Sequence, residues 1–230
     1  MYDRRMAGKT ALLLLLVAAS CSANHMVVPP DIASSTEVVL VTDRSSFSGS
    51  LSDESFKLGP YSIGGVDRDW NSTQTTEMFG MATSRTGGGY AYRFKYGAND
   101  VPAGCVTESG GDATTLSFGL QVSSSFAKLG CTCSDGVKVV ISADTNKRYI
   151  GELSTRKGSY QVTALYDADG QLANDEPTGY RIDGDSALGA VEVLRPGRAF
   201  FRKGLAQEEH ADLACLFAGL MLYETPKEKN

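Results

Sequence analysis

The segment Leu205–Glu224, LAQEEHADLACLFAGLMLYE, limits the possible folds more than any other part of the chain. Acidic residues at its start and good helix formers throughout predict a C-terminal helix over 206–223. From Leu213 to Leu222 no residue is polar, and a helix that is apolar on all sides is buried on all sides. The segment is too short to span a bilayer, which takes about 20 apolar residues. The rest of the fold must therefore surround this helix.

Much of the remaining chain alternates between apolar and polar residues, which is typical of half-buried antiparallel strands. The clearest segments are 90–96, 114–123 and 160–166. Their apolar faces are Tyr90, Tyr92, Phe94 and Tyr96; Leu116, Phe118, Leu120 and Val122; and Tyr160, Val162, Ala164 and Tyr166. Weaker strand candidates, many of them separated by turn-forming Asp and Gly residues, are 37–42, 60–66, 76–83, 103–107, 127–133, 137–143, 148–154, 179–182, 187–194 and 198–202.

This pattern predicts a mainly β fold of about 12 antiparallel strands, arranged as a barrel or curled sheet around the C-terminal helix. A helix of about 17 residues is roughly 25 Å long, which matches the height of a barrel of short strands. The alternative is a β-sandwich with the helix packed on it. No linker or change of composition divides the chain, so 37–226 is expected to form a single domain.

The run GYRIDGDSALGAVEVLRPGRAFFRKGLAQEEHADLACLFAGLMLYE leads from a glycine-led strand through two more strands into the buried helix. This order of elements resembles the tubby, phospholipid scramblase and LURP-one group, in which about twelve antiparallel strands surround a hydrophobic C-terminal helix. The resemblance implies the fold alone, because no residue motif is shared and no lipid-binding or catalytic residue carries over.

The N-terminus has the layout of a secretory signal peptide over 1–20. Arg4, Arg5 and Lys9 precede a short apolar run, and small residues stand directly before Cys21. This arrangement resembles the lipobox of bacterial lipoproteins, in which the signal is cleaved before a cysteine that then carries lipid. An ordinary signal peptide cleaved near the same place is the alternative. Residues 21–36 are polar, contain two prolines and show no periodicity, so they are expected to form a lipid-anchored tether.

The charge composition of the mature chain limits the classes of partner that it is expected to bind. Loss of Arg4, Arg5, Lys9 and Asp3 reduces 22 basic and 27 acidic residues to 19 and 26, a net charge of −7. An acidic chain without a basic stripe is not expected to bind nucleic acid. The expected partners are the membrane, through the N-terminal lipid, and a protein or ligand of the cell envelope. Ser22, in place of Asp, resembles the pattern that is sorted to the outer membrane, facing the periplasm or the cell surface.

Export favours disulfides over thiolate metal sites, and four cysteines remain once Cys21 carries lipid. Cys131 and Cys133 would share one face of a strand, too far apart to bond to each other. The first predicted disulfide is Cys105–Cys131. Cys133–Cys215, which would tie the buried helix to the barrel wall, follows by elimination, with two buried free thiols as its alternative.

Candidate catalytic residues are few. Asp67, Asp69 and Trp70 lie together, and two carboxylates beside a tryptophan are a pattern found in glycan hydrolysis. The structural interpretation is a strand with both acids on one face. His210 lies among acidic residues and is expected to be a solvated residue of the helix start rather than a metal ligand. The sequence predicts neither a cofactor nor a metal site.

Three functions follow as expectations. The first is a lipid-anchored envelope protein that acts as a non-enzymatic binding or structural module. The second is an envelope glycan hydrolase that uses Asp67 or Asp69 near Trp70. The third is a lipid or small-ligand carrier, which a helix filling the barrel argues against.

Overall fold

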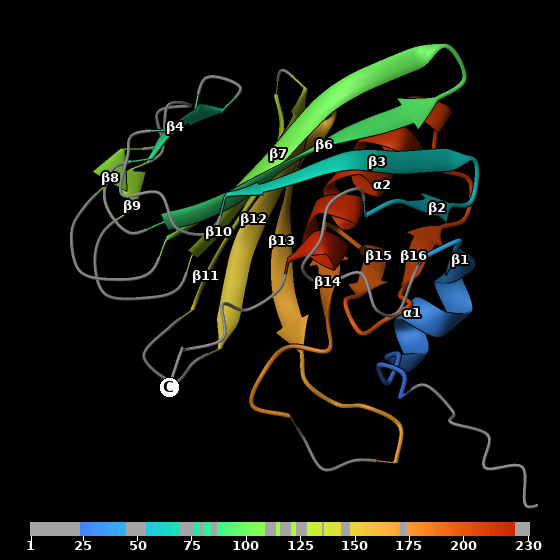
Figure 1. Ribbon diagram of the computed structural model, residues 1–230. Helices are drawn as coiled ribbons and strands as arrows, with labels where there is room; N and C mark the ends of the chain where they lie inside the picture. Colours follow the sequence, from blue (N-terminus) through green and yellow to red (C-terminus); the bar gives the residue numbers. More distant parts are fainter. Residues whose placement is uncertain are drawn as a thin grey trace, which may run out of the picture.

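The computed structural model describes residues 24–44, 54–69, 76–78, 81–83, 87–108, 114–115, 121–122, 128–134, 136–143, 148–170 and 174–223. Twelve antiparallel strands form a closed barrel in the order β1-β16-β15-β14-β13-β12-β11-β10-β7-β6-β3-β2 (Figure 1). The strands are β1 Thr36–Thr42, β2 Phe56–Leu58, β3 Tyr61–Asp69, β6 Gly87–Tyr96, β7 Asn99–Glu108, β10 Lys128–Ser134, β11 Val137–Ala143, β12 Tyr149–Thr155, β13 Gly158–Leu165, β14 Gly179–Asp183, β15 Ala187–Glu192 and β16 Arg198–Arg202. The barrel prediction is confirmed and the sandwich alternative is excluded.

Two expected strands are instead hairpins outside the barrel. The predicted strand 76–83 is β4, Thr76–Met78, paired with β5, Met81–Thr83. The predicted strand 114–123 contains β8, Thr114–Thr115, and β9, Gln121–Val122, which pair with each other. Alternation alone does not reveal a reversal of the chain inside an alternating segment. The apolar residues Leu116, Phe118 and Leu120 lie outside the described residues.

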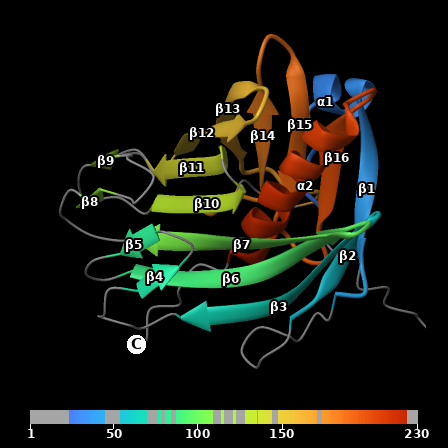
Figure 2. The same ribbon diagram turned by 90° about the horizontal axis from the view of Figure 1, so that it is seen from above.

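The C-terminal helix α2, Gln207–Leu222, passes through the barrel. Figure 2 shows it between β7 and β10 on one side and β15 and β16 on the other. Every residue from Ala211 to Leu222 is buried, as the absence of a polar stripe predicts. The inward faces of the strands supply the other half of this core, including Tyr90, Tyr92 and Phe94, each at most 1% exposed.

Tyrosine hydroxyls inside this core bond to the helix backbone. The Tyr90 hydroxyl donates a hydrogen bond to the carbonyl oxygen of Gly219 at 2.7 Å. The Tyr92 hydroxyl donates one to the carbonyl oxygen of Cys215 at 2.8 Å. A buried tyrosine needs such a partner, because an unpaired hydroxyl in an apolar interior costs about 1–3 kcal/mol. Both bonds come from β6, so this strand sets the position of α2 along the barrel.

The two ends of the barrel differ. At the end where α2 begins, the helix-amino end, short turns join β2–β3, β6–β7, β10–β11, β12–β13 and β14–β15. The longer connections 43–55, 70–86, 109–127 and 166–178 all leave from the other end, where α2 ends. We refer to this as the helix-carboxyl end. Among helices of the described residues, none is both long and apolar enough to cross a membrane.

The expected tether is part of the folded body from Asn24 onward. Met26 is 1% exposed, and helix α1, Pro30–Ser35, packs against the outer faces of β15 and β16. Met26 and Ile32 join Ala190 and Phe200 in an apolar cluster outside the barrel. The prediction of a tether over 21–36 is therefore wrong for 24–36. Isolated apolar residues show no period, so the sequence did not reveal that they bind the barrel wall.

Candidate functional site

The acidic candidate site lies on β3 and is described only in part. Asp67 pairs with Ala91 of β6 and its side chain is exposed. The neighbouring Arg68 turns toward the end of α2, as expected for alternate residues of a strand. The side chain of Asp69 and the whole of Trp70 lie outside the described residues. The structure therefore brings no second catalytic group to Asp67 among the residues that it describes.

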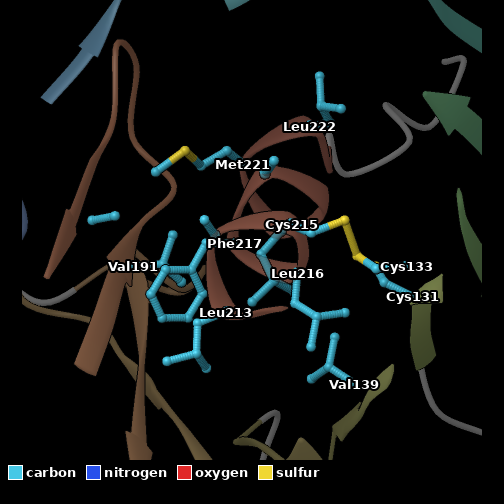
Figure 3. Close-up of a cluster of buried hydrophobic side chains, with 14 of the residues drawn as sticks. Cys131, Cys133, Val139, Val191, Leu213, Cys215, Leu216, Phe217, Met221 and Leu222 are labelled. Carbon is cyan, nitrogen blue, oxygen red and sulfur yellow. A yellow bond between two sulfur atoms is a disulfide. The ribbon is translucent and has the colours of Figure 1, made fainter. Parts of the chain in front are cut away.

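Both predicted disulfides are present. Cys105 and Cys131 are directly opposed on β7 and β10, with their Cα atoms 4.0 Å apart. Cys133 bonds to Cys215 of α2 with a Cα separation of 6.2 Å, and Figure 3 shows this bond joining the helix to the wall. All four cysteines are at most 5% exposed. The alternative of two free thiols is excluded, and Cys21 lies outside the described residues.

A buried carboxylate surrounded by guanidinium groups closes the helix-carboxyl end. Glu54 is 5% exposed. Its Oε1 contacts Arg44 at 3.0 Å and Arg195 at 3.3 Å, and its Oε2 contacts Arg68. Both carboxylate oxygens are thus held by the protein itself. This arrangement, the Glu54 cluster, joins the β1–β2 connection, β3 and the β15–β16 connection at one point.

Two of these arginines also donate hydrogen bonds to the last carbonyl groups of α2. Arg44 donates to the carbonyl oxygen of Met221 at 2.7 Å, and Arg68 donates to that of Leu222 at 2.8 Å. The last four carbonyl groups of a helix have no partner within it and carry partial negative charge, which cations stabilise. We therefore interpret the Glu54 cluster as a structural cap of α2. Sequence reasoning missed it because its members are widely separated along the chain.

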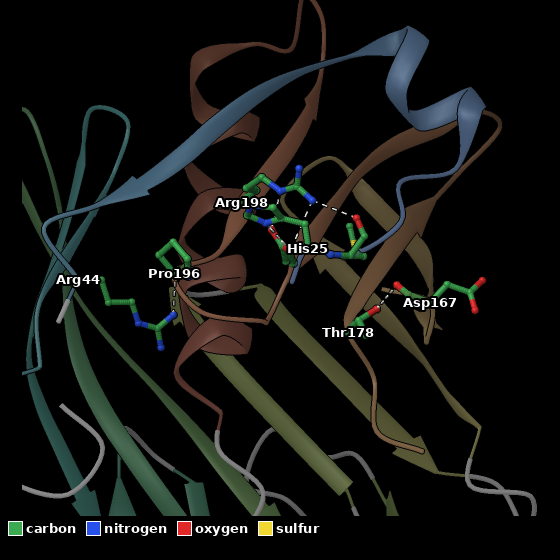
Figure 4. A network of polar contacts seen from close by, with 8 residues as sticks. His25, Arg44, Asp167, Thr178, Pro196 and Arg198 are labelled. Atoms are coloured by element: carbon green, nitrogen blue, oxygen red, sulfur yellow. Dashed lines mark hydrogen bonds and ion pairs between the residues drawn. The ribbon is translucent and has the colours of Figure 1, made fainter. Parts of the chain in front are cut away.

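A second buried carboxylate holds the N-terminal segment. Glu192 of β15 is fully buried; its Oε1 accepts a hydrogen bond from the Met26 amide at 2.6 Å and lies 3.1 Å from His25 Nδ1. Arg198 donates from Nε to Oε2 of Glu192 at 2.6 Å, and from a terminal nitrogen to the Met26 carbonyl at 3.0 Å (Figure 4). We call these four residues the Glu192 latch.

The Glu192 latch is extended by backbone bonds to the β13–β14 connection. Val27 donates to the carbonyl of Asp167 at 2.9 Å, and Asp169 donates to that of His25 at 2.7 Å. A histidine beside a carboxylate also occurs in nucleophilic catalysis, but no Ser, Thr or Cys side chain of the described residues bonds to His25. The visible signal in the sequence was Glu192, a charged residue at the end of the otherwise apolar strand ALGAVE.

His210 contradicts the expectation of a solvated side chain. Its ring stacks on Phe201 at 3.9 Å and on Tyr61 at 5.6 Å between centroids, and the Tyr61 hydroxyl lies 2.7 Å from Nδ1. Burial lowers the pKa of His210 below its usual value, although the carboxylate of Glu37 opposes this. Burial, together with nearby Tyr96, raises the pKa of Tyr61 to about 12. A neutral imidazole whose Nδ1 accepts a hydrogen bond from the Tyr61 hydroxyl fits both shifts.

The neighbouring acids of the helix start are also partnered. Glu209 accepts a hydrogen bond from the Tyr160 hydroxyl at 3.0 Å, and Asp212 is bound by Arg156 at 2.7 Å. In the described part of the chain, no group of three or more His, Cys, Asp or Glu side chains is arranged to hold a metal ion. Comparison with known proteins finds no matching family model, no curated protein of significantly similar sequence and no significantly similar solved structure.

Proposed function

We propose that this chain is an exported bacterial lipoprotein of the cell envelope, anchored through Cys21, that serves as a non-enzymatic binding or structural module. The observation that carries the proposal is the Glu192 latch. It fixes the folded body to a segment that begins three residues after Cys21. A lipid on that cysteine would then hold a rigid barrel at the membrane surface.

The cysteines and the core support this proposal further. Disulfides persist in oxidising compartments, and the four cysteines other than Cys21 form two of them. Side chains of α2 occupy the middle of the barrel, with Leu213, Leu216 and Phe217 all fully buried. A lipid carrier needs that volume for its ligand, so a binding or structural module is favoured over a carrier.

The helix-carboxyl end is the expected binding face of such a module. Four long connections leave the barrel there, and binding residues often lie on connections that a rigid scaffold holds in place. The Glu54 cluster and α2 supply that rigidity. Asp67, Asp69 and Trp70 belong to β3 and the connection that follows it, so they lie in the part of the chain where a ligand or partner would bind.

Fractionation of cells that produce the full chain tests the anchor. The unaltered protein is expected in the membrane fraction with an acylated N-terminal cysteine, measured by mass spectrometry. Cys21→Ser should move it to the soluble fraction, and Ser22→Ala is the matched control. Ser22→Asp should retain the protein in the inner membrane. A Cys21→Ser protein that stays in the membrane fraction would contradict the proposal.

Separate alanine substitutions at Asp67, Asp69 and Trp70 test the hydrolase alternative. If the protein is a binding module, the purified protein should release no sugar from envelope glycan, before or after substitution. Glycan release that Asp67→Ala or Asp69→Ala abolishes, in a protein whose melting temperature is unchanged, would favour the hydrolase instead.

A further inference from the structure

Toward Cys21, the chain leaves the folded body at the outer wall of the barrel, next to the Glu192 latch. Asn24 is the first described residue, and His25 and Met26 are bound to Glu192. A chain extends at most about 3.6 Å per residue, so three residues reach about 11 Å. If Cys21 carries lipid, Asn24 lies within that distance of the lipidated cysteine, and His25 of the latch is one residue further along the chain. The barrel then has little freedom to turn another wall toward the membrane.

The same wall carries exposed aliphatic side chains. Val38 and Leu40 of β1 are 51% and 56% exposed, and Val27 of the N-terminal segment is 42% exposed. Among the described residues, only Ile150 is a further exposed large apolar residue. Single exposed apolar residues are ordinary, but here two of the four, Val38 and Leu40, lie at alternate positions of one strand.

Strand pairing places two of these residues beside the latch. The Cα partner of Leu40 is Arg198, which binds Glu192 and Met26. The partner of Val38 is Phe200, which packs in the outer cluster with Met26. Figure 4 shows β1, in blue, running past Arg198 and His25. Val38 and Leu40, two residues apart on β1, therefore form one exposed apolar surface beside the latch, which we call the β1 wall.

Three acidic side chains near the β1 wall pair with cationic side chains. Glu192 is neutralised by Arg198, with the two side chains 0% and 21% exposed. The exposed carboxylate of Asp31 on α1 pairs with Arg181 at 2.8 Å. Asp43, at the end of β1, pairs with Lys57 at 2.9 Å. Asp31, Asp43 and Glu192 thus each have a cationic partner, whereas Glu37 of β1 is exposed and lies 3.9 Å from the ring of His210.

We propose that the β1 wall rests on the bilayer that receives the Cys21 lipid, with Val38 and Leu40 in its interfacial region. This inference rests on the lipid anchor proposed above and adds the orientation of the barrel. Aliphatic side chains on a surface held next to a bilayer gain by leaving water. With one wall on the membrane, the barrel axis lies along the surface and the helix-carboxyl end remains accessible to a partner.

Tryptophan fluorescence of the full, lipidated protein in vesicles tests this orientation. Trp70 is the only native tryptophan, so Trp70→Phe provides a dark background for Leu40→Trp, Val38→Trp and Ile150→Trp. Ile150 is the matched control, because it is 50% exposed on β12, five positions from β1 in the barrel order. The vesicles contain phosphatidylcholine with or without brominated acyl chains, which quench only tryptophans that enter the bilayer.

We expect quenching of the Leu40→Trp and Val38→Trp proteins to exceed that of Ile150→Trp at least threefold. Equal quenching at all three positions, in protein whose mass shows an acylated Cys21, would overturn the orientation and leave the anchor intact. Protein without lipid on Cys21 would overturn both. Protection of Leu40→Trp from aqueous iodide without quenching by brominated lipid would mean that a second copy covers the wall, and would also overturn the orientation.

Discussion

At the scale of single residues, Gly219 shows how closely α2 fits inside the barrel. A Cβ atom on Gly219 would lie 2.8 Å from Tyr92 Oη, 2.9 Å from Cys105 Sγ and 3.2 Å from Cys131 Sγ. Glycine normally weakens a helix interior by about 1 kcal/mol relative to alanine. Here it is required because the Cys105–Cys131 disulfide packs against the helix backbone at this position.

We expect Gly219→Ala to lower the free energy of unfolding by about 1–2 kcal/mol, because overpacking of a filled core costs more than the gain in helix propensity. Urea denaturation with the disulfides intact measures this. Gly158→Ala is the control, since no atom lies within 4 Å of the Cβ that it adds, and it should change stability by less than about 0.5 kcal/mol. A Gly219→Ala protein as stable as the parent would contradict the packing argument.

The buried ring of His210 predicts a dependence of stability on pH. Its pKa is lower in the folded protein than the usual value of about 6.5 expected on unfolding. The unfolded chain therefore binds the proton more readily, and stability is lost as the pH falls below about 6.5. Urea denaturation between pH 7.5 and 5.5 should show this loss, and His210→Gln should reduce it. His25 is present in both proteins, so an equal loss in both would rule out His210 as the cause.

At the scale of elements, two cross-links act on different parts of the barrel. Cys105–Cys131 joins neighbouring strands that already pair, whereas Cys133–Cys215 joins the wall to α2. Their sequence separations are 26 and 82 residues. Closing a longer loop removes more entropy from the unfolded chain, which corresponds to about 3.5 kcal/mol for the first and about 4.5 kcal/mol for the second.

Removal of Cys133–Cys215 by a double alanine substitution should therefore lower the free energy of unfolding by about 1 kcal/mol more than removal of Cys105–Cys131. Chemical denaturation of the two variants and the parent provides the comparison. A larger loss on removal of Cys105–Cys131 would show that its packing against Gly219, rather than the entropy of the unfolded chain, decides its contribution.

The attachment of the N-terminal segment to the barrel wall depends on the buried carboxylate of Glu192. Glu192→Gln removes the charge that Arg198 faces, and loss of one partner of a buried ion pair costs about 3–5 kcal/mol. Because Arg198 reaches solvent, we expect a smaller loss of stability, about 2 kcal/mol. Hydrogen exchange at the amides of Val27 and Asp169 should accelerate. Glu152→Gln, on the exposed face of β12, is the control, and unchanged exchange in the Glu192→Gln protein would contradict the role of the latch.

At the scale of the whole molecule, the two ends of the barrel and its outer wall are built differently. Short turns gather at the helix-amino end, and the long connections leave from the helix-carboxyl end, where the Glu54 cluster caps α2. The outer wall at β1, β15 and β16 carries the N-terminal segment. The proposed anchor and the proposed membrane contact thus share this outer wall, whereas the expected binding face is the helix-carboxyl end.

The sequence by itself determined the class of fold, because an apolar helix without a polar stripe needs a surrounding wall, and alternating strands supply one. It also predicted both disulfides, since two cysteines on one face of a strand must bond elsewhere, but two free thiols stayed open as the alternative to Cys133–Cys215 until the structure showed that bond. The tertiary structure alone decided the partners of Glu54, Glu192 and His210, which are contacted by residues up to 167 positions away in the chain. The spacing of apolar residues along a segment indicates which of its faces is buried. Ion pairs between distant residues depend instead on how the barrel closes.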